Sequence, residues 1–313
     1  MKFIELKKHI QTGALSPVYW LVGEDGRVAE RARDMLLRKV DALPEFNITQ
    51  FDENASLPEV EACCRSFPLQ SQYRAVVVRG CKSPLDVLKN YFASPQPSTI
   101  LIFVSSEMTS NFSPYLKSVT VVECGRLPRA TLTAFIAKRA ASAGVTVTRA
   151  AAELLIDYTQ GMLAAVENEV DKLTFITDAI TENDVRRNVT PSLEYKIFEL
   201  SDAVNKKEGE KALKILRTLL SDGYAPSAVL SMLENYYRRM MYSVLNRGDK
   251  NLASELGVKE GAVTMALNAA AGRKAPALKR AYDVAVQYER DFKNGLISDK
   301  DAVLSAVLEE LRM

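Results

Sequence analysis

Histidine and cysteine are scarce in this sequence, and their scarcity limits the chemistry that the chain can carry. Among 313 residues there are one histidine, His9, and four cysteines, Cys63, Cys64, Cys81 and Cys124, none of which forms a Cys-x-x-Cys pair. A zinc site needs about four Cys or His ligands at short spacings. The sequence therefore predicts no metal site, and it favours reduced thiols in the core of a cytoplasmic protein.

Long apolar runs and an excess of one charge are also missing. No stretch approaches the length of a membrane span, and residues 1–8 lack the apolar core of a signal peptide, so we expect no membrane partner. The net charge is only +2, so any nucleic-acid binding needs a local basic patch. His9 is alone on a charged N-terminal helix and no Gly-x-Ser-x-Gly elbow is present, so no catalytic residue is predicted.

The first part of the chain alternates between strand-like and helix-like segments. Apolar runs predict short buried strands at 18–22, 48–52, 75–78, 99–104 and 119–123. Val28, Ala32 and Leu36 recur at helical spacing between the first two of these strands. This alternation predicts a parallel sheet with helical crossovers, in an α/β domain spanning residues 1–127.

After residue 127 the strand signals almost stop, and the rest of the chain reads as helical. Apolar stripes in 132–140, 154–158 and 163–173 predict a small helical domain over 128–190, with Gly161 as a helix stop. Thr190-Pro191-Ser192 marks a linker. Further stripes up to Leu311 predict a C-terminal helical bundle over 191–313.

An α/β domain followed by a small helical lid is the layout of many nucleotide-switch proteins, which bind phosphate in a glycine-rich turn after the first strand. That turn is here Gly23-Glu24-Asp25-Gly26, without the lysine and hydroxyl of a phosphate loop and with two acids that repel an anion. We therefore expect no nucleotide cofactor and no nucleotide hydrolysis. A hydrolase with a degenerate phosphate site ranks last among the functions considered.

The segment 66–74 carries the best candidate site. Pro68 disfavours an α conformation at Phe67, so a helix over about 57–65 ends here and leaves Phe67 and Leu69 in a break beside polar Gln70. The buried strand that follows ties the break to a rigid sheet, and an apolar pair on such a loop suits a partner contact. The alternative is that Phe67 and Leu69 only cap the core at a helix-to-strand turn.

Residues 252–267 have the rhythm of a helix–turn–helix motif. They support an alternative function, a DNA-binding regulator. The second helix of the motif offers almost no Arg, Asn, Gln or Lys for base edges, which favours an ordinary pair of core helices. Tyr236-Tyr237-Arg238-Arg239 and other basic pairs permit contacts to a phosphate backbone without demonstrating any.

Several motifs together resemble one family, the delta subunit of bacterial DNA polymerase III, which is part of the sliding-clamp loader. Residues 18–25 (VYWLVGED) resemble its opening strand and acidic turn, and residues 67–78 (FPLQSQYRAVVV) its turn-and-strand pattern. Residues 198–204 (FELSDAV) and 291–295 (DFKNG) are similar to its C-terminal signatures. The resemblance runs in order along essentially the whole chain.

The resemblance implies an α/β plus all-α chain: an ATPase-like (AAA+-type) parallel-sheet domain without a phosphate loop, a helical lid and a helical collar. It implies a subunit that hydrolyses no ATP but belongs to a DNA-directed DNA polymerase, a nucleotidyltransferase. Such a subunit binds the ring-shaped sliding clamp (beta) and opens one interface of the ring for loading on primed DNA. Its other partners would be the motor subunits (gamma/tau), delta-prime and primer–template DNA.

The clamp contact of the family comes from the turn before the third strand, which is here Phe67, Leu69 and Gln70. Many relatives carry an aromatic or a second large apolar residue where Gln70 stands. Two interpretations follow: Phe67 supplies the aromatic anchor in a shifted register, or clamp affinity is weaker in this chain.

Overall fold

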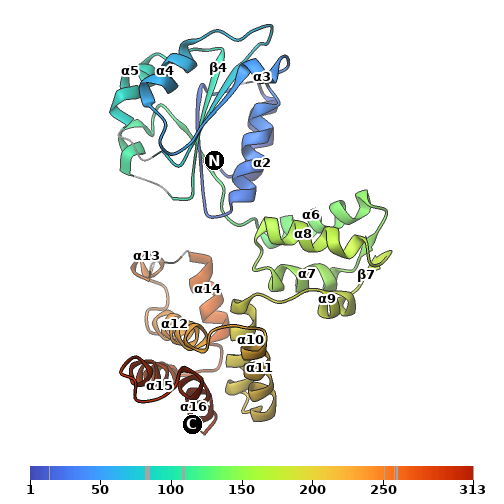
Figure 1. Ribbon diagram of the computed structural model, residues 1–313, viewed down its shortest axis with the longest axis vertical. Coiled ribbons are helices and arrows are strands. Elements are labelled where there is room, and N and C mark those ends of the chain that lie inside the picture. Colours follow the sequence, from blue (N-terminus) through green and yellow to red (C-terminus); the bar gives the residue numbers. More distant parts are fainter. Residues whose placement is uncertain are drawn as a thin grey trace. The chain divides into compact units, whose positions relative to one another are not determined.

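The computed structural model describes residues 1–13, 15–81, 85–107, 110–249, 251–256, 258 and 260–312. Its internal contacts divide the chain into two compact units, Met1–Val189 and Thr190–Met313 (Figure 1). The division falls beside the boundary expected between residues 190 and 191. The boundary expected between residues 127 and 128 lies inside the first unit and stays a prediction.

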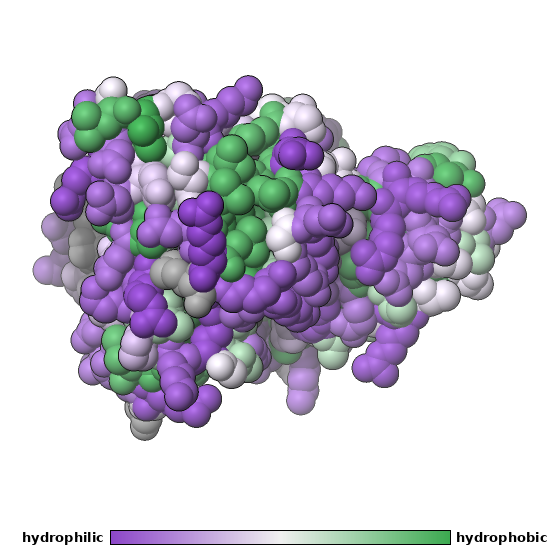
Figure 2. All heavy atoms as spheres, turned by 90° about the horizontal axis from the view of Figure 1, so that it is seen from below, coloured by the Kyte–Doolittle hydropathy of each residue, from purple (hydrophilic) through white to green (hydrophobic). Residues whose placement is uncertain are grey.

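Most of the surface seen in Figure 2 is hydrophilic, and hydrophobic residues gather in limited areas of it. Within the described part of the chain, no helix is long and apolar enough to cross a membrane. The large hydrophobic side chains that are at least half exposed are Phe46, Phe67, Leu69, Phe175, Ile176, Leu245 and Leu296.

A five-stranded parallel sheet forms the centre of the N-terminal part of the first unit (Figure 1). Its order is β2-β3-β4-β1-β5. The strands are β1 (Val18–Val22), β2 (Ile48–Phe51), β3 (Arg74–Arg79), β4 (Thr99–Ser105) and β5 (Thr120–Glu123). The inner strands are buried on both faces, which explains why their sequences are continuous apolar runs. All five expected strands are confirmed to within one residue at each end.

Helices cover both faces of this sheet. One face packs against α4 (Leu57–Arg65), η1 (Leu85–Leu88) and α5 (Lys89–Ala93), around Trp20, Val76 and Leu101. The other carries α1 (Phe3–Gln11) and α2 (Gly26–Leu37). His9 on α1 has a structural role there, because its Nε2 lies 3.0 Å from the Tyr19 hydroxyl of β1. Two short helices, α3 (Pro44–Asn47) and the 3-10 helix η2 (Ser110–Tyr115), complete this part of the first unit.

The remainder of the first unit is mainly helical. It comprises α6 (Arg129–Ser142), α7 (Arg149–Tyr158), α8 (Leu163–Thr174) and α9 (Glu182–Asn188). The sequence did not predict α9, although Thr181 and Asp184 form a capping box at its start. It also did not predict the parallel pair β6 (Thr146–Val147) and β7 (Ala179–Ile180), because two-residue strands are too short to show a hydrophobic period.

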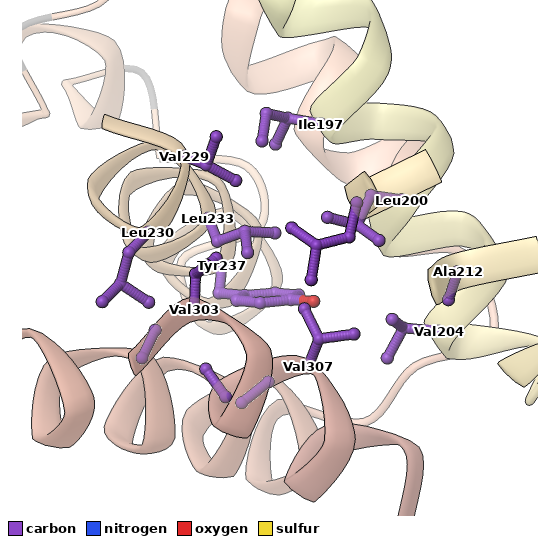
Figure 3. Packing of buried hydrophobic residues seen from close by; sticks show 14 of the residues in the cluster. Ile197, Leu200, Val204, Ala212, Val229, Leu230, Leu233, Tyr237, Val303 and Val307 are labelled. Carbon is purple, nitrogen blue, oxygen red and sulfur yellow. The ribbon is translucent and has the colours of Figure 1, made fainter. Parts of the chain in front are cut away.

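The second unit is a bundle of helices around Tyr237, whose ring lies among Leu200, Leu233 and Val307 (Figure 3). The Tyr237 hydroxyl donates a hydrogen bond to the buried carboxyl group of Glu310. The helices are α10 (Leu193–Asn205), α11 (Gly209–Ser221), α12 (Pro226–Leu245), α13 (Leu252–Glu255), α14 (Glu260–Ala269), α15 (Ala275–Lys293) and α16 (Asp299–Arg312). The expected α/β plus all-α fold class is confirmed.

The helix–turn–helix segment 252–267 corresponds to α13 and α14. Gly257 and Lys259 within it lie outside the described residues. Leu252 and Ala253 are buried, and α14 contacts α12 with Ala266 in the bundle core. The described part of the segment therefore packs as core helices.

Candidate functional site

The 66–73 turn joins α4 to β3. Helix α4 ends at Arg65 because Ser66 is extended and Pro68 follows. The C-terminal carbonyls of the helix are bonded to side chains of the sheet: Thr99 Oγ1 donates to Cys64 O at 2.8 Å, and an Arg74 guanidinium nitrogen donates to Cys63 O at 3.4 Å. The break that the sequence predicts after this helix is confirmed, and these bonds attach the end of α4 to β3 and β4.

The apolar pair of this turn faces solvent. Phe67 is 79% exposed and Leu69 is 50% exposed, and Gln70 is exposed beside them. The structure therefore contradicts the alternative in which Phe67 and Leu69 cap the core. Gln70 has a φ of 53°, in the left-handed region that costs a non-glycine residue on the order of 1 kcal/mol. The chain bends at this residue, directly after Leu69.

A buried asparagine holds the turn in place. Asn47, which ends α3 and is fully buried, accepts a hydrogen bond from Leu69 N at 2.7 Å. Its amide donates to Leu69 O at 2.8 Å and to Ala42 O at 2.8 Å. Both the N–H and the carbonyl of Leu69 are thus bonded by one buried side chain, while the Leu69 side chain stays half exposed.

The far end of the turn is held by Asp41. Its Oδ1 accepts hydrogen bonds from Ser71 Oγ at 2.7 Å and from Gln72 N at 3.1 Å. The bond from Ser71 lowers the pKa of the Asp41 carboxyl below its ordinary value, because it stabilises the charged form. Side chains from the segment before β2 therefore order the turn at Leu69 and at Ser71 and Gln72.

One exposed aromatic next to this turn was missed from the sequence. Phe46 on α3 is 57% exposed, and its carbonyl accepts a hydrogen bond from Arg74 at 2.7 Å. The available signal was an aromatic directly after Leu43-Pro44-Glu45 and outside any apolar stripe. Phe46, Phe67 and Leu69 precede β2 and β3, so they lie at the amino edge of the parallel sheet.

The turn after β1 lies at the opposite, carboxyl edge, where open α/β sheets hold their ligands. Asp25 there is fully buried and caps α2, since its Oδ1 accepts from Arg27 N at 3.1 Å and Val28 N at 3.2 Å. Its second oxygen accepts from Leu163 N at 2.9 Å, at the start of α8. The backbone donors that face a phosphate in a nucleotide-binding turn are bonded here to the chain's own carboxylate.

A second carboxylate extends this contact between α2 and α8. Glu167 on α8 is buried and accepts hydrogen bonds from Arg27 Nε at 2.6 Å and Arg31 Nε at 2.7 Å. The Arg31 guanidinium also lies 4.8 Å from the ring centre of Phe135 on α6. The start of α2 is thus joined to the following helices by internal ionic contacts.

Comparisons with known proteins agree with this architecture. The family model described as "DNA polymerase III, delta subunit" matches residues 19–125, and the model for the C-terminal domain of the same subunit matches residues 194–309. The chain is 25% identical to DNA polymerase III subunit delta of Bacillus subtilis (strain 168) over 331 aligned positions, covering 97% of this chain and 95% of that protein.

Two further matches concern a second relative and a solved structure. The chain is 29% identical over 162 residues to the probable DNA polymerase III subunit delta of Aquifex aeolicus (strain VF5), covering 48% of this chain and 46% of that protein. The Bacillus subtilis DNA clamp loader delta protein shares the fold, with a TM-score of 0.70, 23% sequence identity, and coverage of 99% of this chain and 100% of that chain. The helix–turn–helix regulator gains no support from these comparisons. The chain belongs to the family of DNA polymerase III delta subunits, which are clamp-loader subunits.

Proposed function

We propose that this chain binds the sliding clamp (beta) through the 66–73 turn and opens one interface of the ring, so that the clamp can be loaded on primed DNA in the cytoplasm. The observation that carries this proposal is the exposed pair Phe67 and Leu69 on a turn that hydrogen bonds hold at Leu69 and at Ser71. Large apolar side chains that face solvent on a rigid support are typical anchors of protein interfaces.

The order of the turn favours binding. Because Asn47 and Asp41 already hold the backbone, little conformational entropy is lost when the apolar pair enters a pocket on the clamp. If that pocket fits the pair better when the ring interface is strained open, binding shifts the clamp toward the open state by the difference in affinity. Every ~1.4 kcal/mol of this difference changes the ratio of open to closed rings about tenfold.

The same chain would contribute no nucleotide chemistry. The carboxylate of Asp25 occupies donors at the starts of both α2 and α8, which supports a subunit that neither binds nor hydrolyses ATP. ATP would act through the neighbouring motor subunits (gamma/tau), exposing or withdrawing the turn. The polymerase activity of the holoenzyme would likewise belong to other subunits.

The domain assignment extends this proposal. Residues 1–127 would carry the clamp contact, residues 128–190 would form the lid, and residues 191–313 would form the collar that assembles with the motor subunits and delta-prime. Primer–template DNA would pass through that assembly, and the protein would contact mainly the backbone phosphates of the DNA. The compact bundle of residues 190–313 supports a separate role for the collar.

The proposal is tested by measuring the affinity of the purified chain for the sliding clamp of the same organism, without DNA or nucleotide. We expect the double variant Phe67→Ala/Leu69→Ala to lose at least about 2 kcal/mol of binding free energy, as hot-spot residues do. The matched control is Phe175→Ala/Ile176→Ala, which removes an apolar pair that is 90% and 53% exposed elsewhere in the same unit. Equal binding by the wild type and the first variant would place the clamp contact elsewhere.

Single variants separate the two interpretations of Gln70. If Phe67 is the aromatic anchor, Phe67→Ala weakens clamp binding strongly and Gln70→Ala barely changes it. If the contact needs a residue at the position of Gln70, Gln70→Phe strengthens binding. Phe46→Ala measures whether the neighbouring aromatic belongs to the same contact.

A further inference from the structure

A basic groove lies between α1, α2 and α6. It has a cavity volume of about 680 Å³. One acidic residue, Asp34, lines the groove. Six cationic residues line it as well: Lys7, Arg27, Arg31, Arg38, Lys39 and Lys138. In a chain with a net charge of +2, this is a strong local concentration of positive charge.

Four of these cations are available for a ligand. Arg27 and Arg31 are paired with Glu167, and Asp34 is paired with Arg33. Lys7, Arg38, Lys39 and Lys138 form no ion pair with any residue of the described chain. Cations such as Arg38 and Lys39 are favoured at the C-terminal end of any helix, because they interact favourably with the helix dipole. That local preference does not explain why Lys7 from α1 and Lys138 from α6 converge on the same cavity.

Apolar side chains form part of the same wall. Phe3 on α1 and Met35 on α2 are half-buried, and Ile10, which also lines the groove, is buried. From Arg27 to Arg38 the α2 side of the groove extends for about 16 Å, at 1.5 Å per residue. Grooves that bind single-stranded nucleic acid combine these two features, cations that follow the backbone and an aromatic face against which bases stack.

We infer that this groove binds the sugar-phosphate backbone of single-stranded DNA, with a base against Phe3. The inference deepens the proposed function, on which it rests for the presence of DNA near this chain. Lys7, Lys39 and Lys138 contact phosphates, and Arg38 contacts a further phosphate at the end of α2.

The composition of the groove favours phosphates over the carboxylates of an acidic protein segment. Arginine matches a planar carboxylate with two parallel hydrogen bonds, whereas lysine acts as a point charge that suits a run of phosphates. Three of the four unpaired cations are lysines, and two of the three arginines are already bonded to Glu167. A DNA duplex would present only its outer backbone to the groove, so no base would lie against Phe3.

The test uses the purified full chain and a fluorescently labelled oligodeoxythymidylate of about 16 nucleotides, long enough to span one such site. Affinity is measured by anisotropy over a series of salt concentrations. We expect the double variant Lys39→Ala/Lys138→Ala to bind about tenfold more weakly at low salt. The slope of log affinity against log salt should fall by about 1.4, since each phosphate contact contributes about 0.7.

The matched control is Lys89→Ala/Lys117→Ala, which removes two exposed lysines outside the groove and should bind as the wild type does. Unchanged affinity and slope in the groove variant would overturn the inference, as would the absence of oligonucleotide binding by the folded wild type. Poly-glutamate serves as a competing ligand. If it binds the wild type more tightly than the oligonucleotide does, and fails to bind the groove variant, the groove is assigned to an acidic protein instead. Clamp binding by the groove variant is measured separately, without DNA. Failure of the groove inference can then be distinguished from failure of the clamp proposal.

Discussion

Asp25 provides the sharpest test of how the start of α2 is joined to the start of α8 in the first unit. One carboxylate caps α2 and also accepts the Leu163 amide at the start of α8. Asparagine caps a helix about as well as aspartate does. In Asp25→Asn the single oxygen can stay on α2, but an amide NH₂ group then faces the Leu163 N–H, and two donors cannot bond. Asp25→Asn therefore removes the contact to α8 and keeps the cap.

The expected magnitudes follow from these contacts. Loss of a bond that leaves a buried donor unsatisfied costs about 1–3 kcal/mol, so Asp25→Asn should destabilise the start of α8 by ~2 kcal/mol. Asp25→Ala also loses the cap of α2, worth about 1 kcal/mol, for a total of ~3 kcal/mol. Because Asp25 is fully buried, salt should screen little of this effect.

Hydrogen exchange followed by mass spectrometry measures the two effects separately in the full chain. A loss of ~2 kcal/mol corresponds to about 30-fold faster exchange. In Asp25→Asn we expect this increase in peptides covering 160–170 and none in peptides covering 26–37. In Asp25→Ala both regions should exchange faster, while peptides from α12 serve as the internal control. Exchange of 160–170 at the wild-type rate in Asp25→Asn would refute the proposed contact.

Three further predictions concern stability and reactivity. Gly23→Ala should be severely destabilising, because its Cβ would overlap the backbone carbonyl of Cys124. Gly26→Ala has open space at the first position of α2 and should stabilise the chain by less than the roughly 0.5–1 kcal/mol typical of a helix interior; urea titrations of both variants check this. Burial raises the pKa of Glu310 from 4.5 to about 8. The folded chain therefore holds a proton that the unfolded chain releases, so stability should fall as pH rises from 4.5 to 8, by up to roughly 5 kcal/mol. Glu310→Gln should remove this slope, and parallel urea midpoints for both proteins across that range would contradict it. Burial also raises the pKa of the thiols of Cys64 and, to about 12, Cys124, so iodoacetamide at pH 8 should modify neither until the chain unfolds; rapid labelling of either in the native protein would contradict their burial.

Several features could be predicted from the sequence because neighbouring residues encode them. The inner strands are continuous apolar runs, and the helices carry stripes at helical spacing, so their positions follow from periodicity alone. Pro68 ends α4 through the local geometry of its own ring, which correctly places Phe67 and Leu69 in a break. The sequence did not show whether that pair faces the core or solvent, since both arrangements share the same local pattern.

Only the tertiary structure decided how distant segments complete these sites. Asp25 reads in the sequence as an acid that repels phosphate, and in the fold it bonds an amide 138 residues away. No sequence motif singles out Asn47, and in the fold it holds Leu69, 22 residues further on. The groove likewise depends on Lys7, α2 and Lys138 meeting across the surface of the first unit. Periodicity and turn chemistry act over a few residues, whereas these contacts depend on where the packed chain returns, which no local pattern records.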